Sequence, residues 1–273
     1  RMASRSPSEI GMAAANRSAM AHPASVRDYE RSDYLDDGER ILYDMVSSAY
    51  AGRPILDVGV GAGRTVPALT AISKDYTAVD YTPAMVEACK KRFPDVRVLL
   101  GDARDLSRFP PEHFGLVVFS CAGVDMVGPE DRARIIREVR RVLAHDGAFI
   151  FSTHNFASHE RPTLRKLFPK VELTFNPVRL ARRLLRSLRQ GARHTLNHRR
   201  LRQFETRLHG HAVLTSHYHE YSTMMHFTTL AVQLGQLKDA GFLGEVVSYS
   251  REGLRLETDD PRTSMYHLLA RPF

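Results

Sequence analysis

The stretch from Ile55 to Arg64, Ile-Leu-Asp-Val-Gly-Val-Gly-Ala-Gly-Arg, constrains the fold of this chain more than any other. It begins with a short apolar run that is typical of a buried strand. Three glycines follow at alternate positions, and residues 65–69 can start a helix. Glycines let the backbone and a ligand approach closely, and a helix N-terminus presents free N–H groups. The stretch therefore predicts a ligand cradle between a strand and a helix.

The glycine spacing distinguishes two classes of ligand. Dinucleotide-binding turns follow the pattern G-x-G-x-x-G. Here Gly59, Gly61 and Gly63 follow G-x-G-x-G, and Arg64 stands where the third glycine of the dinucleotide pattern would be. Asp57 precedes the first glycine by two residues. This spacing argues against a nicotinamide-dependent oxidoreductase.

Two further motifs follow the glycine turn. Residues 75–80 read as a strand that ends in Asp80, about 20 residues beyond the turn, where a carboxylate can accept both hydroxyls of a ribose. A third strand, residues 96–100, runs into Gly101-Asp102-Ala103. The three motifs in this order resemble the class I, Rossmann-like S-adenosylmethionine-dependent methyltransferases. The resemblance extends from about Asp28 to the C-terminus.

The fold expected from the chain is α/β. Strands and helices alternate strictly up to residue 153, which indicates a parallel, doubly wound sheet. The resemblance implies a Rossmann-like, seven-stranded, mostly parallel sheet flanked by helices, with the last strand antiparallel and an α/β insertion after strand five forming a cap. We expect a disordered tail (1–27), a cofactor-binding core (28–153), a basic insertion or substrate cap (154–224) and the C-terminal part of the core (225–273).

Inside the insertion, the pattern predicts a basic amphipathic helix over residues 176–188. It also predicts two strands, 198–209 and 212–221, joined by a hairpin turn at 209–211. A helix over 227–240 is expected at the start of the C-terminal part of the core.

The resemblance implies S-adenosylmethionine as cofactor and S-adenosylhomocysteine as product. Asp57 would engage the amino group of the methionine moiety, Asp80 the ribose, and Asp102 the adenine edge; for the last two, capping of their own loops is the alternative. Arg64 would reach the cofactor carboxylate or remain solvated. The full set of expected cofactor-binding residues is Tyr29, Asp57, Gly59, Gly61, Gly63, Arg64, Asp80, Tyr81, Met85, Asp102, Ala103, Ser120 and Cys121.

Catalytic residues are harder to identify, because methyl transfer mainly requires the nucleophile, carbon and sulfur to be held in line. A base is needed only if the acceptor carries a proton. His154, in the loop after strand five, and His219 are the catalytic candidates, with structural or surface histidines as the alternative. In a strand, His217, His219 and Tyr221 would share one face and could line a polar pocket. Tyr34, His217 and Tyr221 are the expected substrate-binding residues, and no metal site is expected.

The positive charge is concentrated in one segment. The whole chain carries +8, but residues 161–210 contain 14 Lys/Arg and two acids, a net charge of +12. This segment can be a lid over an anionic substrate, an RNA-contact surface, or a solvated face that also touches a membrane. Aromatic residues that would stack on bases are sparse there, so the lid is favoured and a nucleic-acid partner is not expected.

These observations predict a methyltransferase that acts on oxygen or nitrogen of a small polar or acidic metabolite, such as a natural-product or sugar-like intermediate. The alternatives are an RNA methyltransferase that uses the basic insertion and a non-catalytic, methyltransferase-like partner protein. No apolar run reaches the length of a membrane span, and the two cysteines suit a reduced, cytoplasmic protein. The oligomeric state is left open, a homodimer included.

Overall fold

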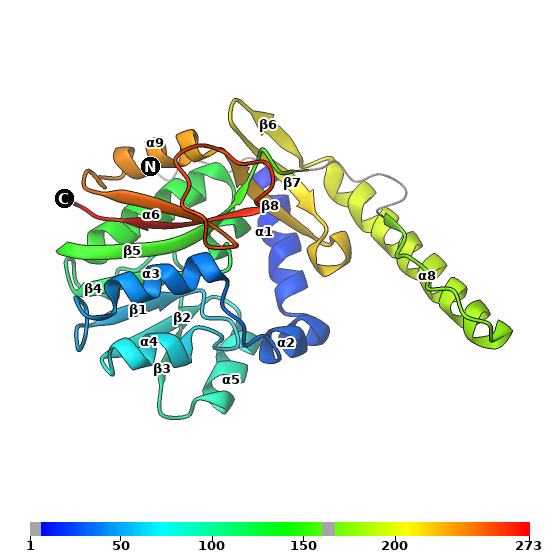
Figure 1. The fold of residues 1–273 in the computed structure, drawn as a ribbon, viewed down its shortest axis with the longest axis horizontal. Coiled ribbons are helices and arrows are strands. Elements are labelled where there is room, and N and C mark those ends of the chain that lie inside the picture. Colours follow the sequence, from blue (N-terminus) through cyan, green and yellow to red (C-terminus); the bar gives the residue numbers. More distant parts are fainter. Residues whose placement is uncertain (1–6, 160–166) are drawn as a thin grey trace.

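The computed structural model describes residues 7–159 and 167–273. Within them, ten strands form one sheet in which the path β3-β2-β1-β4-β5-β8-β7-β6 is hydrogen-bonded and β10 joins β5 to β9 (Figure 1). The strands are β1 (Ile55–Val58), β2 (Tyr76–Asp80), β3 (Arg97–Leu100), β4 (Phe114–Phe119), β5 (Leu143–Asn155), β6 (Thr206–Leu208), β7 (His211–Ser216), β8 (Thr223–Thr228), β9 (Val246–Ser250) and β10 (Met265–Ala270).

Seven of these strands form the core that the sequence predicted, in the order β3-β2-β1-β4-β5-β10-β9. The first five pair in parallel. β10 runs antiparallel to both β5 and β9, as expected for the final strand. The prediction of an α/β, Rossmann-like sheet is confirmed, although β6, β7 and β8 enlarge the sheet beyond seven strands.

Helices cover both faces of the core sheet (Figure 1). On one face, α3 (Asp37–Ser47) packs on β9 and β10, α5 (Pro83–Arg92) packs on β2 and β3, and α4 (Val66–Ile72) lies beside α3. On the other face lie α6 (Pro129–Val142) and α9 (Leu230–Asp239). Their apolar residues recur at helical spacing, so one side of each helix is buried against the sheet.

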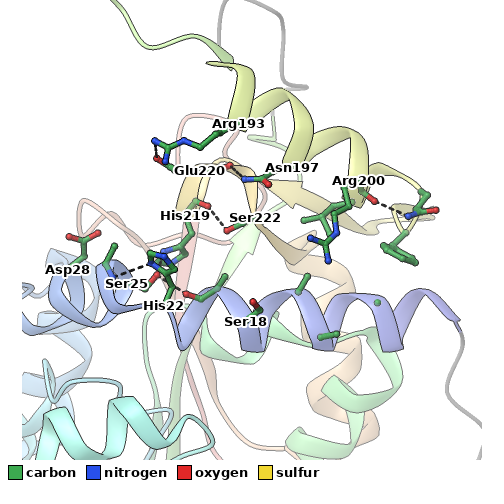
Figure 2. A pocket seen from close by; sticks show the side chains of 18 residues that line it. Ser18, His22, Ser25, Asp28, Arg193, Asn197, Arg200, His219, Glu220 and Ser222 are labelled. Carbon is green, nitrogen blue, oxygen red and sulfur yellow. Dashed lines mark hydrogen bonds and ion pairs between the residues drawn. The ribbon is translucent and has the colours of Figure 1, made fainter. Parts of the chain in front are cut away.

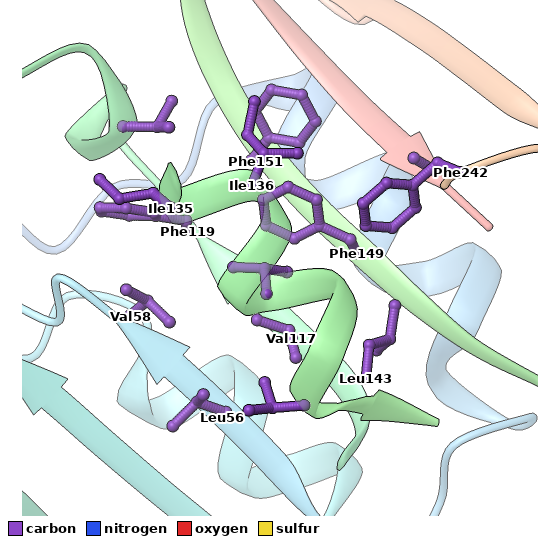
Figure 3. Close-up of a cluster of buried hydrophobic side chains, with 14 of the residues drawn as sticks. Leu56, Val58, Val117, Phe119, Ile135, Ile136, Leu143, Phe149, Phe151 and Phe242 are labelled. Carbon is purple, nitrogen blue, oxygen red and sulfur yellow. The ribbon is translucent and has the colours of Figure 1, made fainter. Parts of the chain in front are cut away.

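Aromatic rings fill the core under α6. Figure 3 shows Phe149 and Phe151 of β5 beside Phe242, and the stacked Phe149 and Phe151 rings have centroids 4.6 Å apart. Every residue of β4 is buried, as its continuous apolar run predicted. This core fixes the ends of β1, β2 and β4, where the candidate site lies.

The N-terminal segment differs from the expected disordered tail. Residues 7–30 form α1 (Pro7–Met20) and α2 (Pro23–Glu30). Met12 is buried against Leu201 and Met224, while the Asn16 side chain donates to the Met126 and Met224 carbonyls at 2.8 Å and accepts from the Met224 N–H at 2.8 Å. The residues that hold α1 are far away in the sequence, in the insertion and at Met126, so the local sequence of residues 7–20 does not indicate the helix.

The insertion also differs from its prediction. The helix expected at 176–188 extends as α8 (Pro177–Arg202) through the first part of the expected strand 198–209, and it projects from the body of the molecule (Figure 1). The second expected strand ends at Ser216, because residues 218–221 form the 3-10 turn η2 (Tyr218–Tyr221). The helix expected over 227–240 is present but begins later, as α9 (Leu230–Asp239), because residues 227 and 228 end β8. The hairpin turn at 209–210 is confirmed.

Candidate functional site

A cavity of about 110 Å³ lies at the carboxyl ends of β1, β2 and β4. In open α/β sheets this edge is where ligands bind. The cavity brings together most of the residues expected to bind the cofactor: Tyr29, Gly59, Gly61, Asp80, Tyr81, Met85, Asp102, Ala103, Ser120 and Cys121. We call it the cofactor cavity.

The glycine turn is shaped for close approach. Gly59 and Gly61 have φ angles of +68° and +55°, which side-chain-bearing residues rarely adopt. A Cβ on Gly59 would lie 2.6 Å from the Phe119 ring, and a Cβ on Gly61 would lie 3.1 Å from the Tyr29 ring. Both positions therefore favour glycine.

Asp80 ends β2 inside the cofactor cavity. Its Oδ2 accepts from the Gly61 N–H at 2.9 Å, and its Oδ1 accepts from the Thr82 N–H at 2.8 Å. Burial raises the pKa of Asp80, and the two backbone N–H groups oppose that rise. A carboxylate offers about four acceptor positions, so capping these two amides leaves capacity for a diol. Loop capping and ligand binding are thus compatible for this residue.

Asp102 lines the cavity but is already engaged. The Arg104 guanidinium donates to both of its oxygens, through Nε at 2.9 and 3.1 Å and through Nη2 at 2.5 Å. Arg104 also donates to Asp131 at 2.7 Å. Burial acts to raise the pKa of Asp102, but the bonds from Arg104 outweigh it and hold the pKa below its usual value. Arg104 and the Ala103 backbone complete this side of the cavity.

Arg64 is not among the residues that line the cofactor cavity. Its guanidinium forms an ion pair with the buried Glu39 of α3, at 2.8 and 2.9 Å, and donates to Ser120 and to the Tyr34 carbonyl. Tyr43 also donates to Glu39 at 2.9 Å. The role of Arg64 visible in the structure is to hold Ser120 and α3 in place. Sequence reasoning missed Glu39, whose only signal is an acid on the inner side of an amphipathic helix.

Asp57 and Gly63 lie behind the cavity rather than in its lining. Asp57 accepts hydrogen bonds from Thr65 at 2.5 Å and Tyr76 at 2.6 Å, and burial raises its pKa to about 6. A Cβ on Gly63 would meet the Phe93 ring at 2.6 Å. Asp57 and Gly63 thus pack against the turn on the side away from the cavity in this structure.

The helix α1 separates the cofactor cavity from a second, larger one. Ala13, Arg17 and Met20 face the cofactor cavity. The opposite side of α1 faces a cavity of about 650 Å³ that also borders α2, α8 and η2 (Figure 2). The residues that line this second cavity are Gly11, Ala14, Ala15, Ser18, Ala19, His22, Ala24, Ser25, Asp28, Arg193, Asn197, Arg200, Leu201, Gln203, Phe204, His219, Glu220 and Ser222.

His219 lies on the boundary between the two cavities. It lines the second cavity, and its ring stacks on Tyr29, which lines the cofactor cavity. The Ser25 hydroxyl donates its proton to the Ala19 carbonyl at 2.7 Å, so its contact with His219 Nδ1 at 3.1 Å requires Nδ1 to be the donor. Nε2 then carries the lone pair. Burial lowers the pKa of His219, which favours this neutral form.

His154, the other catalytic candidate, lines neither of these cavities. Its Nδ1 and its backbone N–H both donate to Asp125 Oδ2, at 2.8 and 2.7 Å. Asp125 in turn forms a buried ion pair with Arg132, which also bonds Gln233 and Thr153. These contacts join η1 (Gly123–Met126), α6, β5 and α9. In this structure His154 is part of that buried cluster.

The three expected substrate-binding residues are not brought together, because residues 217–221 do not continue the strand. His217 and Tyr34 are exposed and line neither cavity. Tyr221 is buried between the rings of His194 and His198, with centroids 5.4 and 6.2 Å away, and so anchors α8. The polar residues of the second cavity instead come from α1, α2, α8, η2 and the residues that flank them.

Comparison with known families identifies the core. Residues 55–147 match a family model described as a methyltransferase domain. This stretch is a methyltransferase domain of the class I, S-adenosylmethionine-dependent type. Among methyltransferases of this family, a Bacillus subtilis protein described as an uncharacterized methyltransferase is 34% identical over 132 residues, or 46% of this chain and 51% of that protein. A Mycobacterium tuberculosis protein described as a probable S-adenosylmethionine-dependent methyltransferase is 25% identical over 131 residues, or 48% and 46%.

The chain thus spans about half the length of the curated methyltransferases it matches. A solved structure resembles it over a longer stretch: the Burkholderia thailandensis 1,6-didemethyltoxoflavin-N1-methyltransferase, with bound 1,6-didemethyltoxoflavin and S-adenosylhomocysteine. The TM-score is 0.57 at 15% identity, covering 99% of this chain and 92% of that one. At this identity the likeness shows a shared methyltransferase fold.

Proposed function

We propose that this protein transfers a methyl group from S-adenosylmethionine to an oxygen or nitrogen of a small polar or acidic acceptor, without a metal. The single observation that carries the proposal is the pair of cavities on either side of α1, joined at the Tyr29–His219 contact. One cavity contains the family's cofactor motifs, and the other has a volume within the usual range for small-molecule sites.

The residues of the cofactor cavity suit the cofactor. Asp80 has acceptor capacity for the ribose hydroxyls, and Gly59 and Gly61 line the same cavity without side chains. Tyr81 and Met85 provide apolar surface for the adenine, and Ser120 and Cys121 lie at the end of β4. The cavity is small because α1 and Tyr29 cover it, so we expect these to move outward when the cofactor binds.

The second cavity suits an acidic acceptor. Figure 2 shows the Arg200 guanidinium directed toward α1, whereas Arg193 is paired with Glu220 at 3.1 Å. A guanidinium recognises a carboxylate or phosphate through paired hydrogen bonds. Leu201, Phe204 and the alanines of α1 provide apolar walls. We therefore propose an acceptor with one anionic group and an apolar portion.

The cofactor supplies an activated methyl group when bound. The chain's own contribution is to align the acceptor and to receive its proton. His219 Nε2 carries a lone pair beside the wall between the cavities, and Ser25 fixes the ring through Nδ1. We propose that His219 accepts the acceptor's proton at Nε2 while Arg200 holds its anionic group, and that Tyr29 and His219 separate so that the two ligands can meet.

Calorimetric titration with S-adenosylmethionine and S-adenosylhomocysteine tests the cofactor part. We expect micromolar binding that Asp80→Ala weakens at least about tenfold, a loss of about 1.4 kcal/mol. Asp105→Ala removes a neighbouring exposed carboxylate and is the matched control. If neither ligand binds the unmodified protein, the proposal is wrong and a non-catalytic role is left.

The acceptor part is tested by formation of S-adenosylhomocysteine with a panel of small carboxylates, phosphates and neutral alcohols or amines. For an acidic acceptor, Arg200→Gln is expected to raise KM at least about tenfold without changing cofactor affinity. Arg199→Gln, at the adjacent exposed position outside the cavity lining, is the control. Equal KM values for the two variants would contradict the role of Arg200.

A further inference from the structure

The outer part of α8 exposes an apolar stripe to solvent. The helix has 26 residues and is about 39 Å long at 1.5 Å per residue. Its C-terminal third lines the second cavity, whereas its N-terminal part extends beyond the body of the protein (Figure 1). Its stripe and the chain just before it expose the large apolar residues Leu173, Phe175, Val178, Leu184, Leu185, Leu188 and Leu196.

Arginines occupy the opposite side of the same helix. At 3.6 residues per turn, Leu184, Leu185 and Leu188 lie on one side, and Arg182 and Arg186 lie on the other. The helix contains nine arginines and no acidic residue between 177 and 202. The segment is therefore amphipathic and strongly cationic.

A third side of α8 is covered by the chain's own residues 167–172. The Ser187 hydroxyl donates to the Pro169 carbonyl at 2.7 Å, and His194 Nδ1 contacts the Leu167 carbonyl at 2.7 Å. Phe168 lies against Gly191, where a side chain would clash. This packing leaves the leucine stripe outside the covered side, and Leu188 remains 59% exposed.

The combination of charge and apolar surface limits what can cover the stripe. In a symmetric dimer the same patch meets itself, so arginine-rich helices without acids would lie against each other. RNA phosphates would pair with the arginines but would leave the leucines in water. An anionic bilayer can contact both the leucine stripe and the arginine side of α8. The leucines enter the boundary between headgroups and acyl chains, while the arginines extend their guanidinium groups to the lipid phosphates.

We propose that α8, together with residues 173–175, binds the surface of an anionic lipid bilayer. The helix lies in the plane of the interface, with Leu184, Leu185 and Leu188 in the boundary between headgroups and acyl chains. Phe175, at the start of the helix, enters the same layer.

Co-sedimentation of the full chain with vesicles tests this surface. One vesicle is phosphatidylcholine alone, and the other is phosphatidylcholine mixed with phosphatidylglycerol. We expect binding to the mixed vesicles that weakens as salt is raised, and at least about tenfold weaker binding to phosphatidylcholine alone. Equal binding to both vesicles, or binding to neither, would overturn the proposal.

Two pairs of variants separate this surface from general charge or stickiness. Arg182→Glu/Arg186→Glu is expected to lower binding to the mixed vesicles at least about tenfold, whereas Arg134→Glu/Arg137→Glu on α6 makes the same charge change and is expected to have little effect. Leu184→Glu/Leu188→Glu is expected to abolish binding, whereas the control Leu243→Glu, at an exposed leucine elsewhere, is not. Retained binding in either α8 variant would contradict the assignment.

If the proposal fails, two measurements identify a different binding partner for α8. A dimer in light scattering that Leu184→Glu/Leu188→Glu dissociates would assign it to a second copy. Salt-sensitive RNA binding lost in Arg182→Glu/Arg186→Glu, without vesicle binding, would assign the arginines to RNA. Asp80→Ala, which is expected to weaken cofactor binding, should bind vesicles normally, so failure of the enzymatic proposal leaves this one testable.

Discussion

The ring of His219 lies nearly parallel to the ring of Tyr29, with centroids 6.1 Å apart and an interplanar angle of 11°. Tyr29 contacts the glycine turn through Gly61, and His219 faces the larger cavity under α8. Two side chains from opposite ends of the sequence thus connect the cofactor motifs to the proposed acceptor site. The two residues make different contacts, so their substitutions should have different effects.

Tyr29→Ala is expected to weaken S-adenosylhomocysteine binding by about 1 kcal/mol, because it removes aromatic surface from the cofactor cavity. His219→Gln is expected to leave this affinity within about twofold and to lower kcat at least about 100-fold, the usual contribution of a positioned base. Calorimetry and product formation with an acceptor from the panel measure the two quantities. Wild-type kcat in His219→Gln would remove the proposed base.

The pH profile provides a second test of His219. Burial holds its pKa below the usual value for histidine, so the imidazole is neutral at pH 7 and becomes protonated only in acid. Turnover by the unmodified protein should therefore be flat near neutrality and fall as the pH drops through that lowered pKa. The residual turnover of His219→Gln should lack this fall. The same acidic limb in both proteins would assign it to another group.

Gly61→Ala and Gly52→Ala form a matched pair. Both glycines have positive φ, +55° and +74°, so either substitution should cost about 1 kcal/mol of folding free energy through backbone strain. A Cβ on Gly52 meets nothing within 4 Å, whereas a Cβ on Gly61 comes within 3.1 Å of Tyr29. Only Gly61→Ala should also weaken cofactor binding. Urea unfolding and calorimetry measure both effects, and equal cofactor affinities would show that the turn is only scaffold.

Asp57 makes stability depend on pH. Burial raises its pKa from 3.8 to about 6, so between these values the folded protein holds a proton that the unfolded chain has released. Its contribution to stability is present below about pH 4 and is lost as pH rises through 6, a change of about 3 kcal/mol. Asp57→Asn removes this dependence. The free energy of unfolding of the variant, relative to wild type, should therefore increase from pH 4 to pH 6 and then stay constant. Urea unfolding measures this difference. A difference that is constant at every pH would contradict the raised pKa.

The Asp125–Arg132 ion pair should behave as a buried one. Neither side chain has solvent-exposed surface, so Arg132→Met leaves an uncompensated carboxylate and is expected to cost about 3–5 kcal/mol in urea unfolding. Asp125→Asn/Arg132→Met removes that charge and should recover part of the loss. Arg262→Met breaks an exposed pair with Asp260 and should leave the unfolding midpoint unchanged. A double variant as unstable as the sum of the singles would contradict this explanation.

The cofactor half of the molecule was predictable because its information is local. Residues 55–64, Asp80 and residues 101–103 each end a strand, and parallel strands bring their carboxyl ends to one edge of the sheet. Knowing the strand order is then enough to bring these residues together. Arg64 was harder, because its direction depends on Glu39, which comes from a helix 25 residues earlier.

The acceptor half depends on contacts that the local sequence does not show. Residues 7–20 look featureless, yet Asn16 bonds the backbone of Met126 and of Met224, 110 and 208 residues away. The pattern of residues 217–221 suits a strand, but His219 and Glu220 adopt left-handed backbone angles and end the pairing. Because residues 7–20 were expected to be disordered, the sequence did not predict that α1 forms a wall of the second cavity. Because residues 217–221 were expected to be a strand, His217 was wrongly placed on the same face as His219.

The three additional strands meet the core at a very short seam. β8 pairs with β5 only through His154–Phe227 and Asn155–Thr228, beyond Phe151, where the pairing of β5 with β4 ends. The seven core strands pair with one another in registers that do not involve β6, β7 or β8. Insertions that differ in length or acceptor can therefore be exchanged at the tip of β5 during evolution without re-registering the cofactor strands, which makes this tip the natural point for grafting a different acceptor specificity.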